Sequence, residues 1–141
     1  MKLDIYLNYR GNCEEAFRLY ERELGGRIVS MMRHGEGPGP ARVPAEWNGK
    51  IMHGHMELGG TVLMGADIPN AEPMRSAYLS LTVESAREAE RVYDLLSDGG
   101  QIYMKMEETF FAERFAMLRD RFGTSWMLMA PREGASPPES A

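Results

Sequence analysis

The sequence predicts an α+β fold built from two tandem copies of a small β-α-β-β-β module. The main observation is an internal repeat, because residues 12–32 reappear with one inserted residue as residues 85–106. Each copy holds a helix with a single apolar stripe, then a glycine pair, then a strand. Neither copy could bury its apolar face alone, so we interpret the chain as two fused modules that share one fold.

The chain has 141 residues, which suits one domain that can bury a core without disulfides or metals. We expect a single domain over residues 1–131. Its first module should span residues 1–67 and its second residues 76–131, with a linker at 68–75. Residues 132–141 are polar and rich in proline and small side chains, and we expect them to form a disordered tail.

The first module begins with a strand, because residues 3–9 alternate apolar and polar side chains. Asn12 followed by Glu15 has the spacing of a capping box and predicts a helix that ends at the glycine pair Gly25-Gly26. The remaining predicted strands of this module are residues 27–33, 50–58 and 61–66.

A long irregular segment, residues 35–49, separates two of these strands. Its glycines and prolines exclude regular structure, and Trp47 lies within it. Long loops inside compact domains are often functional lids. The sequence leaves two alternatives open, a lid or a simple surface loop.

The second module repeats the same order. Ser85 and Glu88 have the spacing of a second capping box, which predicts a helix that ends at residue 97. The predicted strands are residues 76–83, 101–106, 114–120 and 125–130. For the strand at 114–120, either set of alternate side chains could face the interior.

Composition excludes several classes of partner and location. The formal net charge is −5 and the pI is near 5.3, which argues against nucleic acid and anionic membranes as partners. A single cysteine, Cys13, excludes a disulfide framework, and the first residues lack a signal-peptide pattern, so we expect a cytoplasmic protein. Cys13 lies in the first turn of a helix, where it is either a nucleophile or a small packed side chain.

Three segments resemble the PhnB-like branch of the vicinal oxygen chelate superfamily, which has the glyoxalase and bleomycin-resistance fold. The segments are YLNYRGNCEEAFRLYERELGG at residues 6–26, KIMHGHMELGGTVLMGAD at 50–67 and TFFAERFAMLRDRFGTSWMLM at 109–129. The resemblance implies that the strands of both modules form a cupped, partly open mixed barrel with the helices outside. It also implies a cavity for a small-molecule ligand, and homodimers.

The resemblance further implies where the usual metal ligands of the superfamily would lie, on the first and last strand of each module. Matching strands by the repeat gives Asp4 (or Ile5), Met64, Tyr78 and Met127. Two thioethers and a phenol do not suit a divalent cation. We therefore expect no metal at the usual site and no cofactor.

A polar triplet, His53, His55 and Glu57, alternates with apolar Met52, Met56 and Leu58 along the strand at residues 50–58. Alternate residues of a strand are about 7 Å apart, so two neighbouring members could share one metal ion or one ligand. The apolar set should lie under a helix and the triplet should face the cup. The triplet is a displaced metal site, a polar wall that contacts the ligand, or a solvated face.

Other side chains complete the predicted ligand-binding set. Tyr6, Asn8, Tyr78 and Ser80 lie on strand faces inferred to be concave and would supply neutral hydrogen-bonding groups. Trp126, near several phenylalanines, is predicted to belong to the core and cavity wall.

The sequence thus predicts a metal-free protein that binds a small molecule, with the ligand and any catalysed reaction unidentified. The first alternative is a metal-dependent lyase, isomerase or dioxygenase that uses His53, His55 and Glu57. A second alternative is a structural dimer with a vestigial cavity.

Family members often carry a label as 3-demethylubiquinone-9 3-methyltransferase-like. The residues do not support methyl transfer, because the glycine pairs end helices instead of forming a phosphate-binding turn before them.

Overall fold

The computed structural model describes residues 1–132, which divide into two compact units between Pro73 and Met74. The elements of unit 1 are β1 (Ile5–Tyr9), α1 (Cys13–Leu24), β2 (Arg27–Arg33), the short 3-10 helix η1 (Ala45–Trp47), β3 (Ile51–Leu58) and β4 (Thr61–Asp67). Those of unit 2 are β5 (Leu79–Thr82), α2 (Ala86–Ser97), β6 (Gln101–Glu107), β7 (Ala112–Arg119) and β8 (Ser125–Pro131). Within residues 1–132, no helix combines the length and the apolar character needed to cross a membrane.

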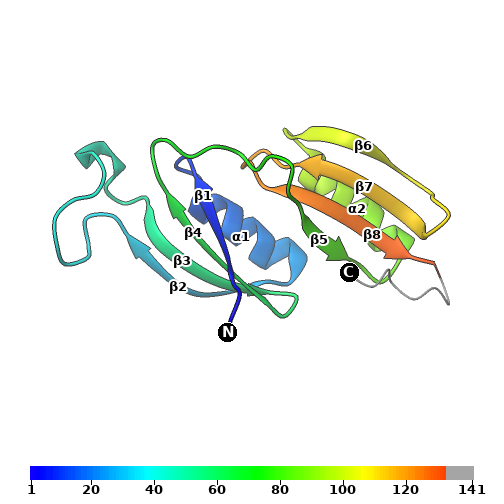
Figure 1. The fold of residues 1–141 in the computed structure, drawn as a ribbon, viewed down its shortest axis with the longest axis horizontal. Coiled ribbons are helices and arrows are strands. Elements are labelled where there is room, and N and C mark those ends of the chain that lie inside the picture. Colours follow the sequence, from blue (N-terminus) through cyan, green and yellow to red (C-terminus); the bar gives the residue numbers. More distant parts are fainter. Residues whose placement is uncertain (133–141) are drawn as a thin grey trace. The chain divides into compact units, whose positions relative to one another are not determined.

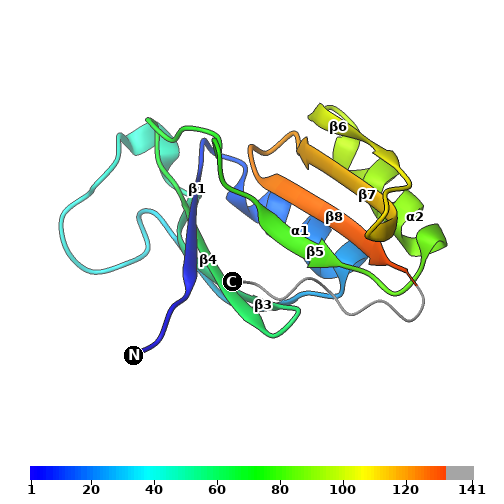
Figure 2. The same cartoon turned by 45° about the vertical axis from the view of Figure 1, so that its right-hand side comes forward.

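Both units have the same topology, which confirms the predicted α+β fold class of two βαβββ modules (Figure 1). Unit 1 has the strand order β1-β4-β3-β2 and unit 2 has β5-β8-β7-β6. In each sheet the first and last strands of the module pair in parallel, and the other pairs are antiparallel. Each sheet carries its own helix along one face, as both views show (Figure 2).

The core of unit 1 lies between α1 and its sheet. Ala16 and Tyr20 are fully buried, as the apolar stripe predicted, and so is Phe17, which the stripe did not include. Gly54 of β3 and Gly65 of β4 lie beneath the Phe17 ring, and a Cβ on Gly65 would be only 2.9 Å from that ring. Because side chains alternate along a strand, the neighbours of these glycines point away from α1.

The core of unit 2 lies between α2 and its sheet. Ala89, Val92 and Leu96 of the helix are buried, together with Leu118 of β7 and Leu128 of β8. The ion pair between Arg114 of β7 and Glu90 of α2 lies on the same side of the sheet. This settles the orientation of β7, because residues of the other parity must face away from α2.

The two helices begin differently, although the sequence predicts a capping box for both. Ser85 accepts a hydrogen bond from the Glu88 amide at 3.1 Å, as predicted. The Asn12 side chain makes no capping bond, so that part of the prediction is wrong. A distant residue also fixes the start of α1, since Asp67 at the end of β4 accepts the amide hydrogens of Gly11 and Cys13, which flank Asn12.

Several strand boundaries also differ from the predicted ones. β1 begins at Ile5 and β5 at Leu79, two and three residues later than predicted, while β7 spans Ala112–Arg119 instead of 114–120. Asp120 leaves the strand because its carboxylate caps the following turn, accepting the amides of Phe122 and Thr124. Of the predicted tail, only Arg132 is described, and its guanidinium bonds the Thr109 and Phe110 carbonyls. Residues 133–141 lie outside the described residues.

The segment between β2 and β3 extends from the end of the sheet in both views, drawn in cyan (Figures 1 and 2). Its two ends are joined by hydrogen bonds, from the His34 amide to the Lys50 carbonyl and from the Gly49 amide to the His34 carbonyl. It includes η1, which the sequence did not predict, and the Trp47 ring lies over Gly11 at the start of α1. The segment is therefore a closed loop fixed at its base.

Candidate functional site

Polar side chains gather on the face of the first sheet that points away from α1, called here open face 1. Tyr6 of β1, Met64 of β4 and His55 of β3 lie directly opposite one another in the strand register. Asn8 lies beside Ala66, two pairs further along and so on the same face as Tyr6. The side chains predicted from β1 and β3 therefore share one face of unit 1.

The Tyr6 hydroxyl and the His53 Nδ1 atom are 3.2 Å apart, and their ring centroids are 5.7 Å apart. Burial raises the pKa of Tyr6 above its ordinary value of 10, so the phenol stays neutral at physiological pH. A neutral phenol and an imidazole can each donate or accept. The pair therefore forms a prearranged polar contact on open face 1.

Glu57, the third member of the predicted triplet, makes a separate interaction. Its carboxylate pairs with the Arg27 guanidinium at 2.8 Å, and the Glu57 side chain is 49% exposed. Among residues 1–132, no group of three or more His, Cys, Asp or Glu side chains is placed to hold a metal ion. Glu57 thus lies in a surface ion pair at the rim, beyond the two histidines.

The positions of the superfamily's usual metal ligands are divided between the units. Asp4 precedes β1 and pairs with Lys2 at 3.6 Å, while Met64 lies on open face 1. Tyr78 precedes β5, and Met127 lies opposite Ser80. Thioether and phenol groups at these positions do not match the ligands of a divalent metal enzyme.

The face of the second sheet that points away from α2, called here open face 2, is mainly apolar. Phe115 lies opposite Met129, and Met117 lies opposite Met127, in the β7–β8 register. Phe111 packs on this cluster. Ser80 of β5 and Tyr78 just before that strand, both predicted ligand contacts, lie at one edge of the sheet. The Tyr78 ring meets the ring of Tyr103, from β6 at the other edge, edge-on with centroids 6.4 Å apart.

Trp126 does not join Tyr78 and Ser80. It is 2% exposed, and its Nε1–H donates to the Asp120 carboxylate at 2.9 Å. Trp126 alternates with Met127 along β8, so its ring lies on the α2 side of the sheet. The structure therefore places Trp126 in the core of unit 2, away from open face 2.

Met52 lies on the opposite side of its sheet from the one that the sequence predicts. Strict alternation would place it under α1 with Met56 and Leu58, but β3 contains a bulge at Met52, since His53 opposes Met32 while Ile51 opposes Arg33. Ile51 is fully buried, and the Met52 methyl group instead lies against Gly37 of the loop. The sequence did not indicate that Met32 and Met52 lie on open face 1, because no local pattern identifies a bulge.

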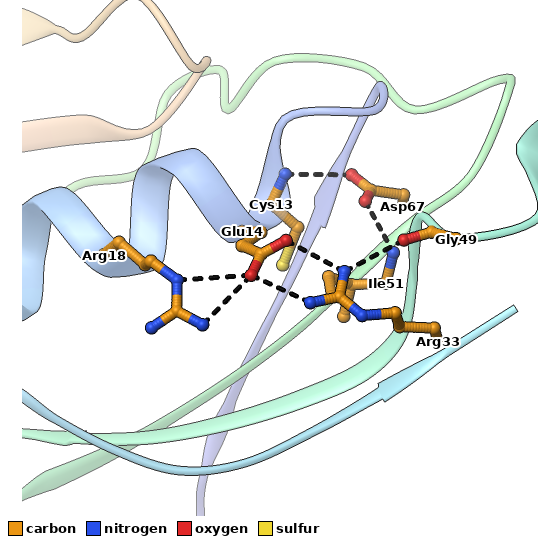
Figure 3. A network of polar contacts seen from close by, with 7 residues as sticks. All are labelled: Cys13, Glu14, Arg18, Arg33, Gly49, Ile51 and Asp67. Atoms are coloured by element: carbon orange, nitrogen blue, oxygen red, sulfur yellow. Dashed lines mark hydrogen bonds and ion pairs between the residues drawn. The ribbon is translucent and has the colours of Figure 1, made fainter.

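A network of charges fixes the first turn of α1 (Figure 3). Arg33 donates to both carboxylate oxygens of Glu14, at 2.8 and 2.9 Å, and also to the Gly49 carbonyl. Arg18 donates to Glu14 as well, at 3.0 and 3.2 Å. These bonds, those from Arg33 most of all, lower the pKa of Glu14 from 4.5 to about 2.

Replacing Glu14 by glutamine should change the acid dependence of stability. Because the folded pKa of Glu14 is below its ordinary value, its stabilising effect is complete above about pH 4.5 and is lost as the pH falls toward 2. Above about pH 4.5, wild type should therefore have a higher free energy of unfolding than Glu14→Gln, by under ~1 kcal/mol. This difference should disappear as the pH falls from 4.5 toward 2. Urea unfolding at several pH values measures this, with Glu46→Gln on η1 as the control. A difference that is constant with pH would contradict it.

Cys13 lies beneath this network and is fully buried. Burial, reinforced by Asp67 and Glu14, raises the pKa of its thiol far above the ordinary value of 9.0. Its Sγ would be 3.2 Å from a Cβ on Gly65. A protonated thiol without solvent access fits the interpretation of a small packed side chain and not that of a nucleophile.

An open pocket of about 340 Å³ lies at the start of α1 and is lined by Asn12, Glu14, Arg18, Lys50 and their neighbours. Glu14 and Arg18 are already paired with each other in this wall. The pocket contains none of the predicted ligand-binding residues. Its charges serve to join α1 to the base of the loop.

Comparison with known proteins identifies the family. The family model described as 3-demethylubiquinone-9 3-methyltransferase matches residues 1–129. Protein YjdN from Escherichia coli (strain K12) is 32% identical over 138 residues, covering 91% of this chain and 94% of that protein. The crystal structure of PA1353 from Pseudomonas aeruginosa has a TM-score of 0.81 at 38% identity, covering 93% of this chain and 98% of the other.

A PhnB protein from Bacillus cereus has a TM-score of 0.76 at 28% identity, over 92% of this chain and 99% of that one. A glyoxylase/bleomycin resistance protein/dioxygenase domain from Frankia sp. EAN1pec shares the fold, with a TM-score of 0.61 at 16% identity, over 94% of this chain and 98% of the other. With two β-α-β-β-β units and these relatives, the chain belongs to the family described as 3-demethylubiquinone-9 3-methyltransferase and has the glyoxalase/bleomycin resistance fold.

Proposed function

We propose that this chain binds a small organic molecule on open face 1, through Tyr6, Asn8, His53 and His55. The observation that carries the proposal is the 3.2 Å contact between the Tyr6 hydroxyl and His53 Nδ1 on a partly exposed sheet face. The Tyr6 side chain reaches this contact from β1 across β4, so the two polar groups are already arranged before a ligand binds. Prearranged polar groups reduce the entropy lost on binding.

The chemistry of this face indicates the class of ligand. Phenol, imidazole and amide groups can both donate and accept hydrogen bonds, which suits hydroxyl, carbonyl or carboxyl oxygens. Met64 lies between Tyr6 and His55 and offers an adaptable apolar surface. The proposed ligand is a small oxygen-bearing molecule with an apolar part.

We propose that binding does not depend on a divalent metal. Met64, Tyr78 and Met127 at the superfamily's usual positions are poor ligands for hard and borderline cations. The ion pair with Arg27 also occupies Glu57, the carboxylate that the metal-enzyme alternative requires.

Open face 2 is proposed as a second contact surface in unit 2. Phe115 and Met129 are each 7% exposed and give an apolar floor, beside which Tyr78 and Ser80 supply hydroxyl groups. Aromatic and thioether side chains suit flat or polarisable ligand groups.

The experiment uses a panel of small organic acids, phenols and diols, titrated into the protein labelled with 15N at histidine. Binders should shift the ring resonances of His53 and His55. Asn8→Ala and His55→Ala should weaken each binder about tenfold, since each removes a polar contact worth roughly 1.4 kcal/mol. A chelator should leave the affinities unchanged.

Asn70→Ala is the matched control for Asn8→Ala, because Asn70 is exposed in the segment after β4 and should leave the affinity unaltered. Binders that leave the His53 and His55 resonances unmoved would contradict the proposal. So would equal affinities for wild type, Asn8→Ala and His55→Ala.

We propose that the protein forms homodimers in the cytoplasm. Support for the dimer comes from β6, an edge strand on which Ile102, Tyr103 and Met104 are 47%, 43% and 42% exposed. Support for the compartment is the single cysteine, which leaves no partner for a disulfide within the chain. Sedimentation equilibrium tests the first point, and a monomer mass at all concentrations would contradict it. Cell fractionation tests the second.

A further inference from the structure

Two methionines and one histidine lie at the loop end of open face 1. Met32 of β2 lies directly opposite His53 of β3. The Met32 and Met52 sulfurs would be 3.6 and 3.9 Å from a Cβ built on Gly37 of the loop. Both sulfurs therefore lie close to one point of the loop backbone, next to the His53 strand position.

The bulge in β3 creates this arrangement. Ile51 faces the core and Gly54 faces Phe17, so Met52 and His53 are consecutive residues on the side away from α1. Bulges redirect individual side chains and occur often beside functional sites. Without the bulge, Met52 would lie under the helix and the cluster would lose one sulfur.

Exposure distinguishes these methionines from core filling. Met32 is 45% exposed, and Met52 is partly exposed, whereas Met56 on the α1 side of the same strand is fully buried. Gly37 allows the loop backbone to approach the thioethers, because any side chain there would come within 3.1 Å of the Met52 methyl. The thioethers are thus covered on one side by backbone and remain reachable from another.

His53 is held in a way that suits a ligating histidine. Its Nδ1 atom is 3.2 Å from the Tyr6 oxygen. When Nδ1–H donates to that oxygen, Nε2 carries the free lone pair, and an outer hydrogen bond of this kind orients most metal-binding histidines. Tyr6 would then act as a positioning residue for the imidazole.

The ligand set selects the kind of cation. Two neutral thioethers with one neutral imidazole favour a soft monovalent ion such as Cu(I), while Mg²⁺, Ca²⁺ and Zn²⁺ prefer oxygen, nitrogen or thiolate ligands. The nearest carboxylate on the same strand face, Glu57, is paired with Arg27. We propose that Met32, Met52 and His53 form a Cu(I) site beneath the loop.

This site goes beyond the proposed binding of an organic molecule and shares with it His53 and the Tyr6 hydroxyl that positions the His53 ring. Ag(I) serves as the redox-inert probe, and Cu(I) affinity is measured without oxygen against a chromophoric chelator. Wild type should bind one Ag(I) per chain and shift the methyl resonances of Met32 and Met52 and the Nε2 resonance of His53. Met32→Leu and Met52→Leu should each weaken binding at least tenfold.

Met64→Leu and Met104→Leu are the matched controls, because Met64 shares open face 1 and Met104 is an exposed methionine of unit 2. Leucine keeps the apolar volume, and unfolding curves verify that each variant folds. Three results would overturn the proposal. They are the absence of Ag(I) binding, equal Ag(I) affinity of Met52→Leu and the controls, and binding of Zn²⁺ at these residues as strong as that of Ag(I). Asn8→Ala separates the two proposals, since it should impair organic ligands and leave Ag(I) binding intact.

Discussion

Replacing Asp67 by alanine should lower the free energy of unfolding of unit 1 by about 3 kcal/mol or more. The Asp67 carboxylate is 1% exposed and accepts the amide hydrogens of Gly11, Cys13 and Ile51, at 3.0, 2.9 and 2.9 Å. Removing it leaves two buried donors, the amides of Cys13 and Ile51, and one part-buried donor, that of Gly11, without this acceptor. Each loss at a buried donor costs roughly 1–3 kcal/mol before relaxation. Figure 3 shows how the bonds to Cys13 and Ile51 join α1 to β3.

Hydrogen exchange measured amide by amide tests this expectation, together with urea unfolding. The amides of Gly11, Cys13 and Ile51 should lose protection before the amides of unit 2. Asp94→Ala is the control, because Asp94 is exposed on α2 and should change stability by less than ~0.5 kcal/mol. Unchanged protection of these amides in Asp67→Ala would refute the role assigned to the carboxylate.

Replacing Gly100 by alanine should destabilise unit 2 by about 3 kcal/mol, whereas Gly26→Ala in the repeat-equivalent position should cost about 1 kcal/mol or less. A Cβ on Gly100 would overlap the Arg119 carbonyl oxygen and approach the Asp120 Cα to 3.1 Å. Both atoms belong to the backbone and cannot move without disturbing β7. A Cβ on Gly26 would meet the Met56 sulfur at 3.1 Å, and that side chain can rotate away.

The comparison between the two glycines is internal, since each follows the same helix in its own copy of the repeat. Chemical denaturation and amide exchange in β6 and β7 give the two effects. If Gly100→Ala and Gly26→Ala lowered the free energy of unfolding equally, the loss would come from backbone flexibility and not from the lack of space beside Gly100.

The sequence by itself determined the architecture. The repeat predicted two equivalent units, and the apolar stripes predicted α1 and α2 almost to the residue, because amphipathic spacing and a glycine after the last turn are local signals. Alternation also grouped Tyr6 with Asn8 along β1 and His53 with His55 along β3, since the side-chain period of a strand needs no tertiary information. The pairing of both strands with β4 brings the two groups onto one face.

Only the tertiary structure decided which equivalent-looking residues behave alike. Asn12 resembles Ser85 in sequence, but its side chain makes no capping bond, and Asp67, which comes 55 residues after Asn12, accepts the amide hydrogens of Gly11 and Cys13 on either side of it. The orientation of β7 depended on packing against α2. Trp126 lies in the core, where its Nε1–H donates to the Asp120 carboxylate. The bulge that brings Met52 beside His53 arises from the register between two strands. These features depend on contacts between residues far apart in the chain, which a local sequence pattern cannot predict.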